Sequence, residues 1–463
     1  MGRLTRRKLL VAYGLWIFGL VAYFLPGATW SPASRFALTR AVVEHRALSI
    51  DGFEDSTGDR ARRGDHWYSD KAPIPSLFAV PAHVLTNAVL DVTRRPIHFE
   101  SVGDDAERIR VNRSFQLALW ICSLVTSGLA SAAIAIVLFV ALARRTTSFG
   151  AFACSTITVL ATPLFPYGTS FYGHAPAALF LLAPLLVATS EAPSRRALRI
   201  AGAGVALAAG CEYLTLVPGL VIATFIVRRE RRALVDLALG AAVPALFVAA
   251  YHTICFGAPW ETGYGHLVRP RFVAGHARGV LGLHFPRVDV TFALLFGPRR
   301  GLFYIAPVTL VGVAGLVRGW QRGDRACVIA ASAALTMLLL NAGYYMWWGG
   351  AATGPRHLVP VLPMLAFGFT RAWESARLRW LVTVLAIASF AIMLAFVAVG
   401  LEAPEHGNVL TTYVWPNIKR ARIGGIPGAS NIGLLAGLGP VASLVPIVGW
   451  TCAGTAWFGR RVR

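Results

Sequence analysis

Long apolar segments recur along most of the chain, and short clusters of basic residues separate them. About 20 predominantly apolar residues are enough to cross the hydrocarbon core of a bilayer as a helix. The pattern therefore predicts an all-α polytopic membrane protein with about twelve transmembrane helices, in a range of roughly eleven to thirteen. The predicted spans are residues 9–25, 114–143, 148–165, 174–191, 199–211, 213–227, 233–252, 302–317, 326–345, 357–370, 380–400 and 431–457.

The basic clusters set the expected orientation, because short loops rich in Lys and Arg stay on the cytoplasmic side of a membrane. One orientation places all of the short clusters on the side of the N-terminus, and an even number of crossings then leaves both termini in the cytoplasm. The first apolar segment lacks a small-residue cleavage pattern, so we expect it to be retained as a span. The clusters lie at residues 144–145, 195–199, 228–232, 318–325, 371–379 and 460–463.

The first external segment is expected to hold structure of its own. Residues 34–48 carry apolar side chains on one helical stripe bordered by Arg35 and Arg40, which predicts an amphipathic helix lying in the headgroup layer. Residues 73–90 are apolar but contain three prolines, so they either cross the membrane or re-enter it. The chain then divides into the cytoplasmic N-terminus and first span (1–25), the first external loop (26–113), the helical bundle (114–400), and a further external loop with the last span (401–463).

Composition supports a membrane protein and argues against several other classes. Hydrophobic residues make up 56% of the chain and charged residues 14%, and the mean hydropathy of +0.59 lies well above that of soluble domains. The six cysteines are scattered, mostly in apolar runs, and have no metal-binding or disulfide spacing. The net charge of +22 comes largely from basic clusters at the ends of apolar segments, so it indicates membrane topology rather than nucleic-acid binding.

The predicted external loops contain nearly all of the polar and aromatic motifs of the chain. These loops are residues 26–113, 167–173, 256–300, 347–354 and 402–430. With the residues just inside the following spans, they read DGFEDSTGD, HWYSDKAP, YGTSFYGH, FGAPWETGYGH, FGPRRG and YYMWWGGAATGPRH. Such one-sided clustering predicts a functional site at the outer face. Glu212, between two short apolar runs, is expected at a helix turn, because a charge within the bilayer costs at least about 2.5 kcal/mol.

Residues 49–72 are the most highly charged stretch, with five Asp, one Glu, three Arg, one Lys and one His. Charge this dense beside a membrane indicates either chemistry or a solvated connector. Asp and Gly also form turns and helix caps readily, so several of these acids need no catalytic role.

The order of the motifs resembles a known family. An apolar first span, the segment RFALTRAVVEHRALSID, the acidic loop ending in WYSDKAP, and then FGAPWETGY, GPRRGLFYIAP and WWGGAATGPRHLVPVLP look like the C-type (GT-C) fold of polytopic glycosyltransferases. The chain is most similar to the bacterial branch related to protein mannosyltransferases and to the enzyme that transfers aminoarabinose to lipid A. The likeness covers residues 9–370 and rests on the order of the motifs.

The resemblance implies a reaction as well as a helical bundle. It implies transfer of a sugar from a polyprenyl-phosphate donor to a lipid, glycan or protein acceptor, on the extracytoplasmic face of the bacterial cytoplasmic membrane. Relatives carry an essential Asp shortly before an Arg-Tyr pair that follows the first span. Here the matching pair is Arg35-Phe36, and no acid immediately precedes it. The carboxylate of an active enzyme would then lie in the charged stretch, at Asp51, Asp55, Asp59, Asp65 or Asp70.

The chemistry of this transfer gives the candidate residues their roles. A carboxylate can take the proton of the acceptor, and Asp59 is the first candidate for this base, with Asp51 second. Lys71 resembles the lysine that precedes a proline in the family's loop, and would stabilise the leaving phosphate. Arg356, close to several glycines, offers a bidentate fork for the same group. Further candidates for substrate contact are Tyr68, Asp70, His174, Tyr264, Arg300, Trp348 and His357.

Other interpretations of these residues stay open. His174 and His357 suit hydrogen-bonded interface histidines, Asp70 and Lys71 a local ion pair, and Trp348 an interfacial aromatic belt. No spacing requires a metal, although the broader fold allows a divalent cation. Membrane lipids are the only other expected partners. The alternative functions are a transporter or lipid flippase, which predicts ionisable residues along a midplane pathway and two matching halves, and an inactive relative that scaffolds envelope assembly.

Overall fold

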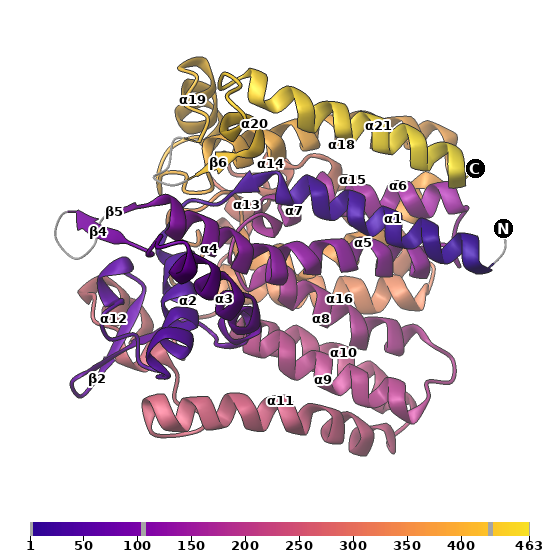
Figure 1. The fold of residues 1–463 in the computed structure, drawn as a ribbon. Helices are drawn as coiled ribbons and strands as arrows, with labels where there is room; N and C mark the ends of the chain where they lie inside the picture. The colour runs from indigo at the N-terminus through magenta and orange to yellow at the C-terminus, as the bar shows by residue number, and fades with distance from the viewer. Residues whose placement is uncertain (1–2, 103–107, 425–428, 463) are drawn as a thin grey trace.

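The computed structural model describes residues 3–102, 108–424 and 429–462, so small parts of the predicted first external loop and C-terminal segment lie outside the described residues. Figure 1 shows a bundle of long helices with both termini at one end, and a layer of short helices and hairpins at the other end. We call this second end the outer layer; it is built mainly from residues 24–73, 93–102, 108–112, 256–301 and 344–356.

The helices are α1 (Arg3–Ala22), α2 (Trp30–Arg40), α3 (Ile74–Val92), α4 (Arg113–Ser123), α5 (Leu129–Leu142), α6 (Ser148–Leu160), α7 (Leu164–Gly168), α8 (His174–Thr189), α9 (Arg195–Cys211), α10 (Leu216–Arg229), α11 (Ala233–Phe256), α12 (Pro270–His276), α13 (Val288–Phe296), α14 (Leu302–Ile305), α15 (Val308–Gln321), α16 (Arg325–Gly343), α17 (Leu365–Trp373), α18 (Ala376–Val399), α19 (Trp415–Lys419), α20 (Ile432–Leu435) and α21 (Val445–Val462). The 3-10 and π segments are η1 (Ala41–His45), η2 (Glu54–Ser56), η4 (Leu124–Gly128), η5 (Tyr213–Thr215), η6 (Gly263–His266), η7 (Arg356–Met364), η8 (Val409–Val414) and η9 (Ala442–Leu444).

Five helices within the described ranges are long and apolar enough to cross a membrane. They are α3, the continuous helix of α4, η4 and α5 (Arg113–Leu142), α11, α16 and α18. Two further apolar helices, α6 and α8, are shorter. The chain is therefore a helical protein of membrane type, but the predicted number of about twelve spans is not confirmed. Residues 74–92, whose state the sequence left open, form one of the five helices.

Proline residues explain why two predicted spans are not continuous α-helices. Pro360 and Pro363 cannot donate backbone hydrogen bonds, and the first half of the predicted span 357–370 is the 3-10 segment η7. The predicted span 302–317 breaks before Pro307, between α14 and α15. In a third predicted span, residues 431–457, the long helix α21 begins only at Val445.

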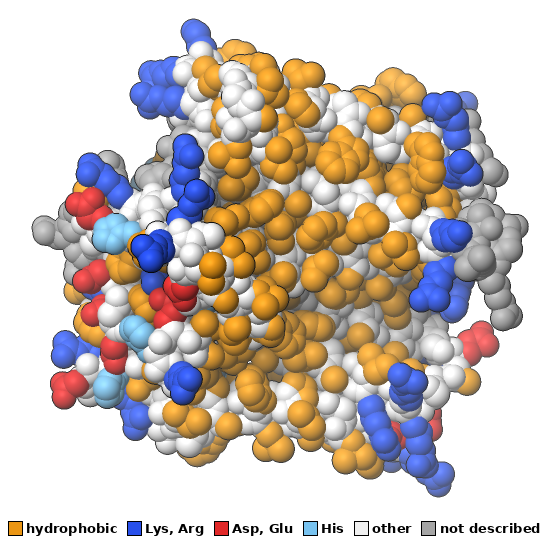
Figure 2. Space-filling model, in the orientation of Figure 1, with side chains coloured by type: hydrophobic (Ala, Val, Ile, Leu, Met, Phe, Trp, Pro, Cys, Tyr) orange, Lys and Arg blue, Asp and Glu red, His pale blue; other side chains and the backbone are white. Residues whose placement is uncertain are grey.

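An apolar belt covers the side of the bundle that Figure 2 displays, and charged side chains gather at its two ends. Lys and Arg dominate the end that holds the termini, whereas acidic and histidine side chains mix with them at the outer layer. At the end with the termini, Asp324 caps the start of α16 and pairs with Arg145 and Arg371, so that three helical segments are joined by one carboxylate. An apolar belt between two charged ends is the surface expected of a protein whose middle lies in lipid and whose two ends lie in water.

The helix predicted for residues 34–48 has a different position from the one expected. It is α2, which begins at Trp30, and every residue from Ser31 to Arg40 is buried. Arg35 does not reach toward headgroups, because its guanidinium donates to Glu212 at 2.8 Å. Arg40 pairs with Glu44, one turn later. Protein carboxylates therefore take the place that the sequence prediction gave to lipid phosphates.

Three small antiparallel hairpins or pairs add strands to the predicted all-α fold. Strand β2 (Arg60–Arg63) pairs with β3 (His66–Ser69), and β4 (Phe99–Val102) pairs with β5 (Arg108–Val111). The third pair joins β1 (Phe24–Leu25) to β6 (Ser430–Asn431), so that the end of the first helix is held to a segment near the C-terminus.

Glycines allow a very close contact between two helices of the bundle, at the crossing of α15 and α17. A Cβ atom at Gly368 would lie 1.9 Å from the carbonyl oxygen of Gly312, and one at Gly315 would lie 2.1 Å from the carbonyl oxygen of Gly368. Backbones can approach this closely only where both helices present small residues.

Replacing Gly368 with Val should force α15 and α17 apart. Overpacking of this kind costs about 1–3 kcal/mol, so the variant should melt at a lower temperature than the wild type in detergent. Gly449→Val on α21 is the matched control, because a Cβ atom there meets no other atom within 4 Å. Equal loss of melting temperature in both variants would contradict the proposed close crossing.

Candidate functional site

The second half of the charged stretch contains a hairpin, formed by β2 and β3. In the register of these strands, Arg60 lies opposite Ser69. Asp59 directly precedes the first of these residues, and Asp70 and Lys71 directly follow the second. Antiparallel pairing therefore places the residues that flank the two ends of the hairpin beside each other.

Lys71 forms the centre of a buried cluster of charges. Its Nζ atom lies 2.8 Å from an oxygen of Asp59 and 3.2 Å from an oxygen of Asp70. The side chains of Asp59 and Lys71 are each 11% exposed, and that of Asp70 is 3% exposed. A lysine this well enclosed needs carboxylate partners to remain charged.

The two carboxyl groups of this cluster have different proton affinities. Burial, together with the charge of Asp59, raises the pKa of Asp70 to about 6 against the opposing effect of Lys71. Burial also acts on Asp59, but the charge and hydrogen bond of Lys71 outweigh it and hold the pKa of Asp59 below its ordinary value. Burial alone would lower the pKa of Lys71, yet the two carboxylates raise it. Asp59 and Lys71 thus form a charged pair at neutral pH.

Arg356 points into the same region from the start of η7. Its side chain lies over Gly349, where a Cβ atom would come within 3.1 Å of it, and the φ angle of this glycine is +75°. The guanidinium also stacks near the ring of Tyr172, at 5.9 Å from its centroid. Among the described residues, no carboxylate forms an ion pair with Arg356, and its Nε atom is buried without a hydrogen-bond partner.

Two neighbouring cavities meet at Asp59 and Arg356. The larger has a volume of about 280 Å³ and the smaller about 60 Å³. Both are lined by Asp59, Phe272, Met346 and Arg356. The smaller cavity is completed by Asp70, Lys71, Tyr264, Leu267, His276, Tyr344, Tyr345 and His357. An acid and an arginine are therefore exposed to both spaces.

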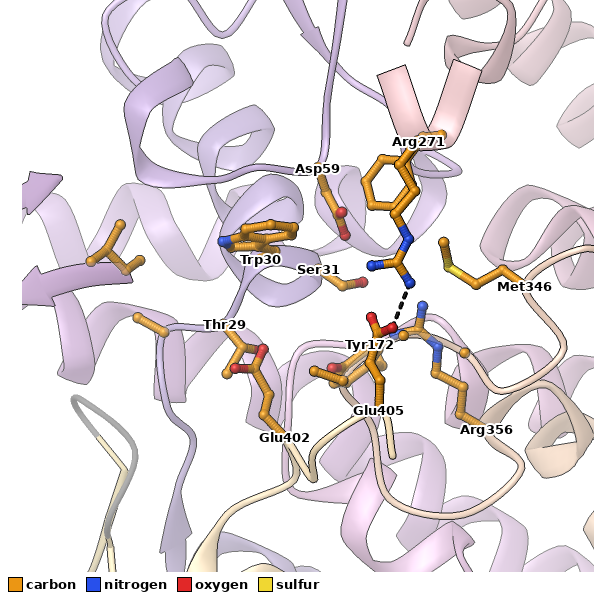
Figure 3. Close-up of a pocket in the computed structure, with 16 residues that line it drawn as sticks. Thr29, Trp30, Ser31, Asp59, Tyr172, Arg271, Met346, Arg356, Glu402 and Glu405 are labelled. Carbon is orange, nitrogen blue, oxygen red and sulfur yellow. Dashed lines mark hydrogen bonds and ion pairs between the residues drawn. The ribbon is translucent and has the colours of Figure 1, made fainter. Parts of the chain in front are cut away.

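The larger cavity brings together residues that the sequence analysis did not single out. Figure 3 shows Trp30, Arg271, Glu402 and Glu405 around it, and an ion pair joins Arg271 to Glu405 at its rim. Arg271 belongs to α12, whereas Glu402 and Glu405 follow α18. No local motif marks these residues. The only available signal was their position in predicted external loops.

Asp51 and Tyr68 lie away from both cavities. The carboxylate of Asp51 accepts hydrogen bonds from His66 and from the backbone N–H of Trp67, so it fastens the hairpin to the turn before η2. Tyr68 packs against Phe256 with ring centroids 5.5 Å apart. Asp55, also a candidate, is 65% exposed and pairs with Arg60.

Arg300 has a position in the loop framework rather than in a cavity wall. Its side chain is 0% exposed, and its guanidinium donates to the backbone carbonyls of Arg299, Trp348, Gly350, Ala403 and Pro404. It therefore joins the loop before η7 to the loop after α18. The ring of Trp348 faces the guanidinium of Arg299 at 5.1 Å and does not line either cavity.

The remaining candidate residues lie beneath or beside the smaller cavity. Tyr264 and His357 line it directly. His174 is 3% exposed and lies behind His357, with ring centroids 6.2 Å apart. Its Nδ1 atom is 3.3 Å from Glu212, which also holds Arg35 and lies, as expected, at the turn after α9.

Within the described ranges, no group of three or more His, Cys, Asp or Glu side chains is arranged to hold a metal ion. No protein-family model matches the chain, and no curated protein is significantly similar to it in sequence.

The raised pKa of Asp70 predicts a pH-dependent effect of Asp70→Asn. In the folded protein the carboxyl binds its proton more tightly than an ordinary Asp, so the stability that it contributes is lost as pH rises from 3.8 to about 6. The variant does not lose this contribution. Its melting temperature should therefore rise relative to that of the wild type between pH 4 and 7. Thermal unfolding in detergent measures the difference, with the exposed Asp55→Asn as control. A difference that is independent of pH would contradict the assignment.

Arg300→Met should destabilise the outer layer, because five backbone carbonyls would lose a charged donor. Hydrogen bonds to charged groups are worth about 1.5–3 kcal/mol each, and we expect a net loss of about 3 kcal/mol. The exposed Arg278 supplies a matched control, Arg278→Met, which should leave the melting temperature within about 1 °C of the wild-type value. Equal melting temperatures for all three proteins would contradict a framework role.

Proposed function

We propose that this protein is a membrane glycosyltransferase that moves a sugar from a polyprenyl-phosphate donor to a lipid, glycan or protein acceptor. The observation that carries the proposal is the meeting of the Asp59–Lys71 pair and the unpaired Arg356 at two cavities. This site lies in the outer layer, at the end of the bundle opposite the termini (Figure 1). A donor with an apolar chain and a phosphate headgroup matches cavities that Lys71 and Arg356 line, beside an apolar belt.

In this proposal, Lys71 and Arg356 contact the phosphate of the donor. Breaking the bond between the anomeric carbon and the phosphate oxygen leaves negative charge on the phosphate, and fixed cations stabilise that charge. Arg356 suits this role because no carboxylate of the described residues forms an ion pair with it. A buried guanidinium without such a partner gains most from an anionic ligand.

Asp59 is the carboxylate of the proposed reaction centre. Lys71 keeps it ionised, and an ionised carboxylate beside the anomeric carbon stabilises the positive charge that develops there during glycosyl transfer. The acceptor would enter through the larger cavity, where Trp30 and Tyr172 offer aromatic surface. Sites that bind a sugar commonly combine carboxylates with aromatic side chains.

The proposed topology follows from the resemblance and from the charge distribution. The bundle would be of the GT-C type with about twelve crossings, in a bacterial cytoplasmic membrane. The termini and the Asp324 cluster would face the cytoplasm, and the outer layer would face the extracytoplasmic side. Helices that are too short to cross the membrane alone would do so packed against a neighbouring helix.

The test is transfer of radiolabelled sugar from a panel of polyprenyl-phosphate hexoses and pentoses by the purified protein in nanodiscs. Asp59→Asn should reduce turnover at least about 100-fold, because the charge at the reacting carbon is lost. Asp55→Asn, in the same stretch but 65% exposed, should stay within about 2-fold of the wild type. Correct folding of each variant is checked by thermal unfolding.

Donor binding provides a second measurement that does not require an acceptor. Arg356→Met breaks no ion pair within the described protein, so it should fold normally and bind polyprenyl phosphate about 10-fold or more weakly. Arg278→Met is the control. If the wild type transfers sugar from none of the donors, yet moves lipid or solute in proteoliposomes, the transporter alternative replaces this proposal.

A further inference from the structure

The larger cavity is lined by three carboxyl groups, and they differ in their partners. Asp59 is paired with Lys71, and Glu405 is paired with Arg271. Glu402 also lines the cavity, but within the part of the chain that the structure describes no cation lies within ion-pair distance of it. It is therefore the carboxyl group of this wall that is available to exchange a proton with a ligand.

Neutral groups lie beside the carboxyl group of Glu402. Helix α18 ends at Val399, and Gly400, which follows it, has a φ angle of +109°. The hydroxyl of Thr29 and the backbone N–H of Trp30 face the carboxyl group and favour its ionised form. Figure 3 shows Glu402 beside Thr29, whereas Asp59 lies on the other side of Trp30. The two acids therefore reach the cavity from different segments of the chain.

The surroundings of Glu402 determine when it carries a proton. Burial, together with the charge of Asp59, raises its pKa to about 7. The hydrogen bond from Thr29, the charge of Arg356 and the hydrogen bond from Trp30 act in the opposite direction. The other titratable or charged groups that face it are Tyr172, Tyr413, Arg271 and Glu405. Glu402 thus changes its charge near neutral pH, whereas Asp59 does not.

We propose that Glu402 is a further catalytic residue of the proposed transferase and takes the proton of the acceptor. The inference rests on the proposed function. It divides the work between two acids: Asp59 stays ionised, holds Lys71 and faces the anomeric carbon, and Glu402 serves as the base. A base works best when its pKa lies near the working pH, and a carboxylate with a lowered pKa is a weak base. The sequence prediction of Asp59 as the base is thereby replaced by a role in charge stabilisation.

The O–H or N–H bond of the acceptor breaks, and its proton passes to a carboxylate oxygen of Glu402. The acceptor atom forms a bond to the anomeric carbon of the sugar. The bond between that carbon and the phosphate oxygen breaks, and its electron pair leaves with polyprenyl phosphate, whose charge Lys71 and Arg356 stabilise. The proton on Glu402 is then released to water.

The pH dependence of kcat tests this assignment through Glu402→Gln. The amide oxygen of Gln still accepts the hydrogen bonds from Thr29 and Trp30, so the variant keeps its support but cannot take a proton. In the wild type kcat should rise with pH and level off above about 7, because only ionised Glu402 is active. In the variant kcat should fall by about 100-fold or more, and this rise should disappear.

Glu405→Gln is the matched control, because it removes a carboxylate of the same cavity that is already paired with Arg271. It should keep the wild-type shape of the pH profile. Thr29→Val gives a second, milder variant, because it leaves Glu402 in place and removes a hydrogen bond that lowers its pKa. The rise in kcat should then move to higher pH.

The outcomes separate the two proposals. Sugar transfer with an unchanged pH profile in Glu402→Gln would overturn the role of Glu402 and leave the transferase intact. If Glu402→Gln does not fold, an unmoved profile in Thr29→Val has the same consequence. Loss of the rise in Glu402→Gln, together with its shift in Thr29→Val, supports the assignment. Absence of transfer by the wild type from every donor removes both proposals.

Discussion

A buried lysine between two carboxylates is the interaction on which the outer layer depends. Lys71 reaches Asp59 from the opposite end of the hairpin, so the pair forms only in the observed register of β2 and β3. Removing the charge of Lys71 would leave both carboxylates buried without this partner, which typically costs about 3–5 kcal/mol. A slip of one residue in the hairpin would turn these side chains to the opposite face and break the pair. The need to pair a buried charge thus fixes local geometry.

The helices below supply the rigid support that such a cluster requires. The bundle does not contribute charges to the cavities; it fixes where the connecting loops begin and end. Arg300 then joins two of these loops through their carbonyl groups, and Arg35 joins α2 to the turn that holds Glu212. Charged hydrogen bonds of this kind are strong in a dry environment, because no water competes for the same donors. The hydrogen bonds of Arg300 and Arg35 therefore hold the cavity walls in position, although neither residue lines either cavity.

Local sequence patterns predicted the features that depend on neighbours in the chain. Apolar runs located the main helices, and the charged stretch indicated Asp59, Asp70 and Lys71, which do lie together. Features that depend on distant residues were not predictable in this way. Arg35 was assigned to lipid headgroups, but its partner Glu212 lies 177 positions away. Hydropathy alone also does not register where prolines break a helix or where an apolar helix is short, so the predicted count of about twelve spans is not confirmed.

The pairing of β1 with β6 has a consequence for biosynthesis. A ribosome adds about 5–20 residues per second, so roughly 20–70 s separate the synthesis of Asp59 from that of Glu402. During that interval the nascent chain already has the lysine and its two acids but lacks one wall of the larger cavity, and β1 has no partner strand until residues 430–431 emerge. Completion of the cavity is therefore among the last events of assembly. A chain that terminates before residue 402 would present Arg271 and Arg356 without Glu402 and Glu405, two of the carboxyl groups that line the same cavity.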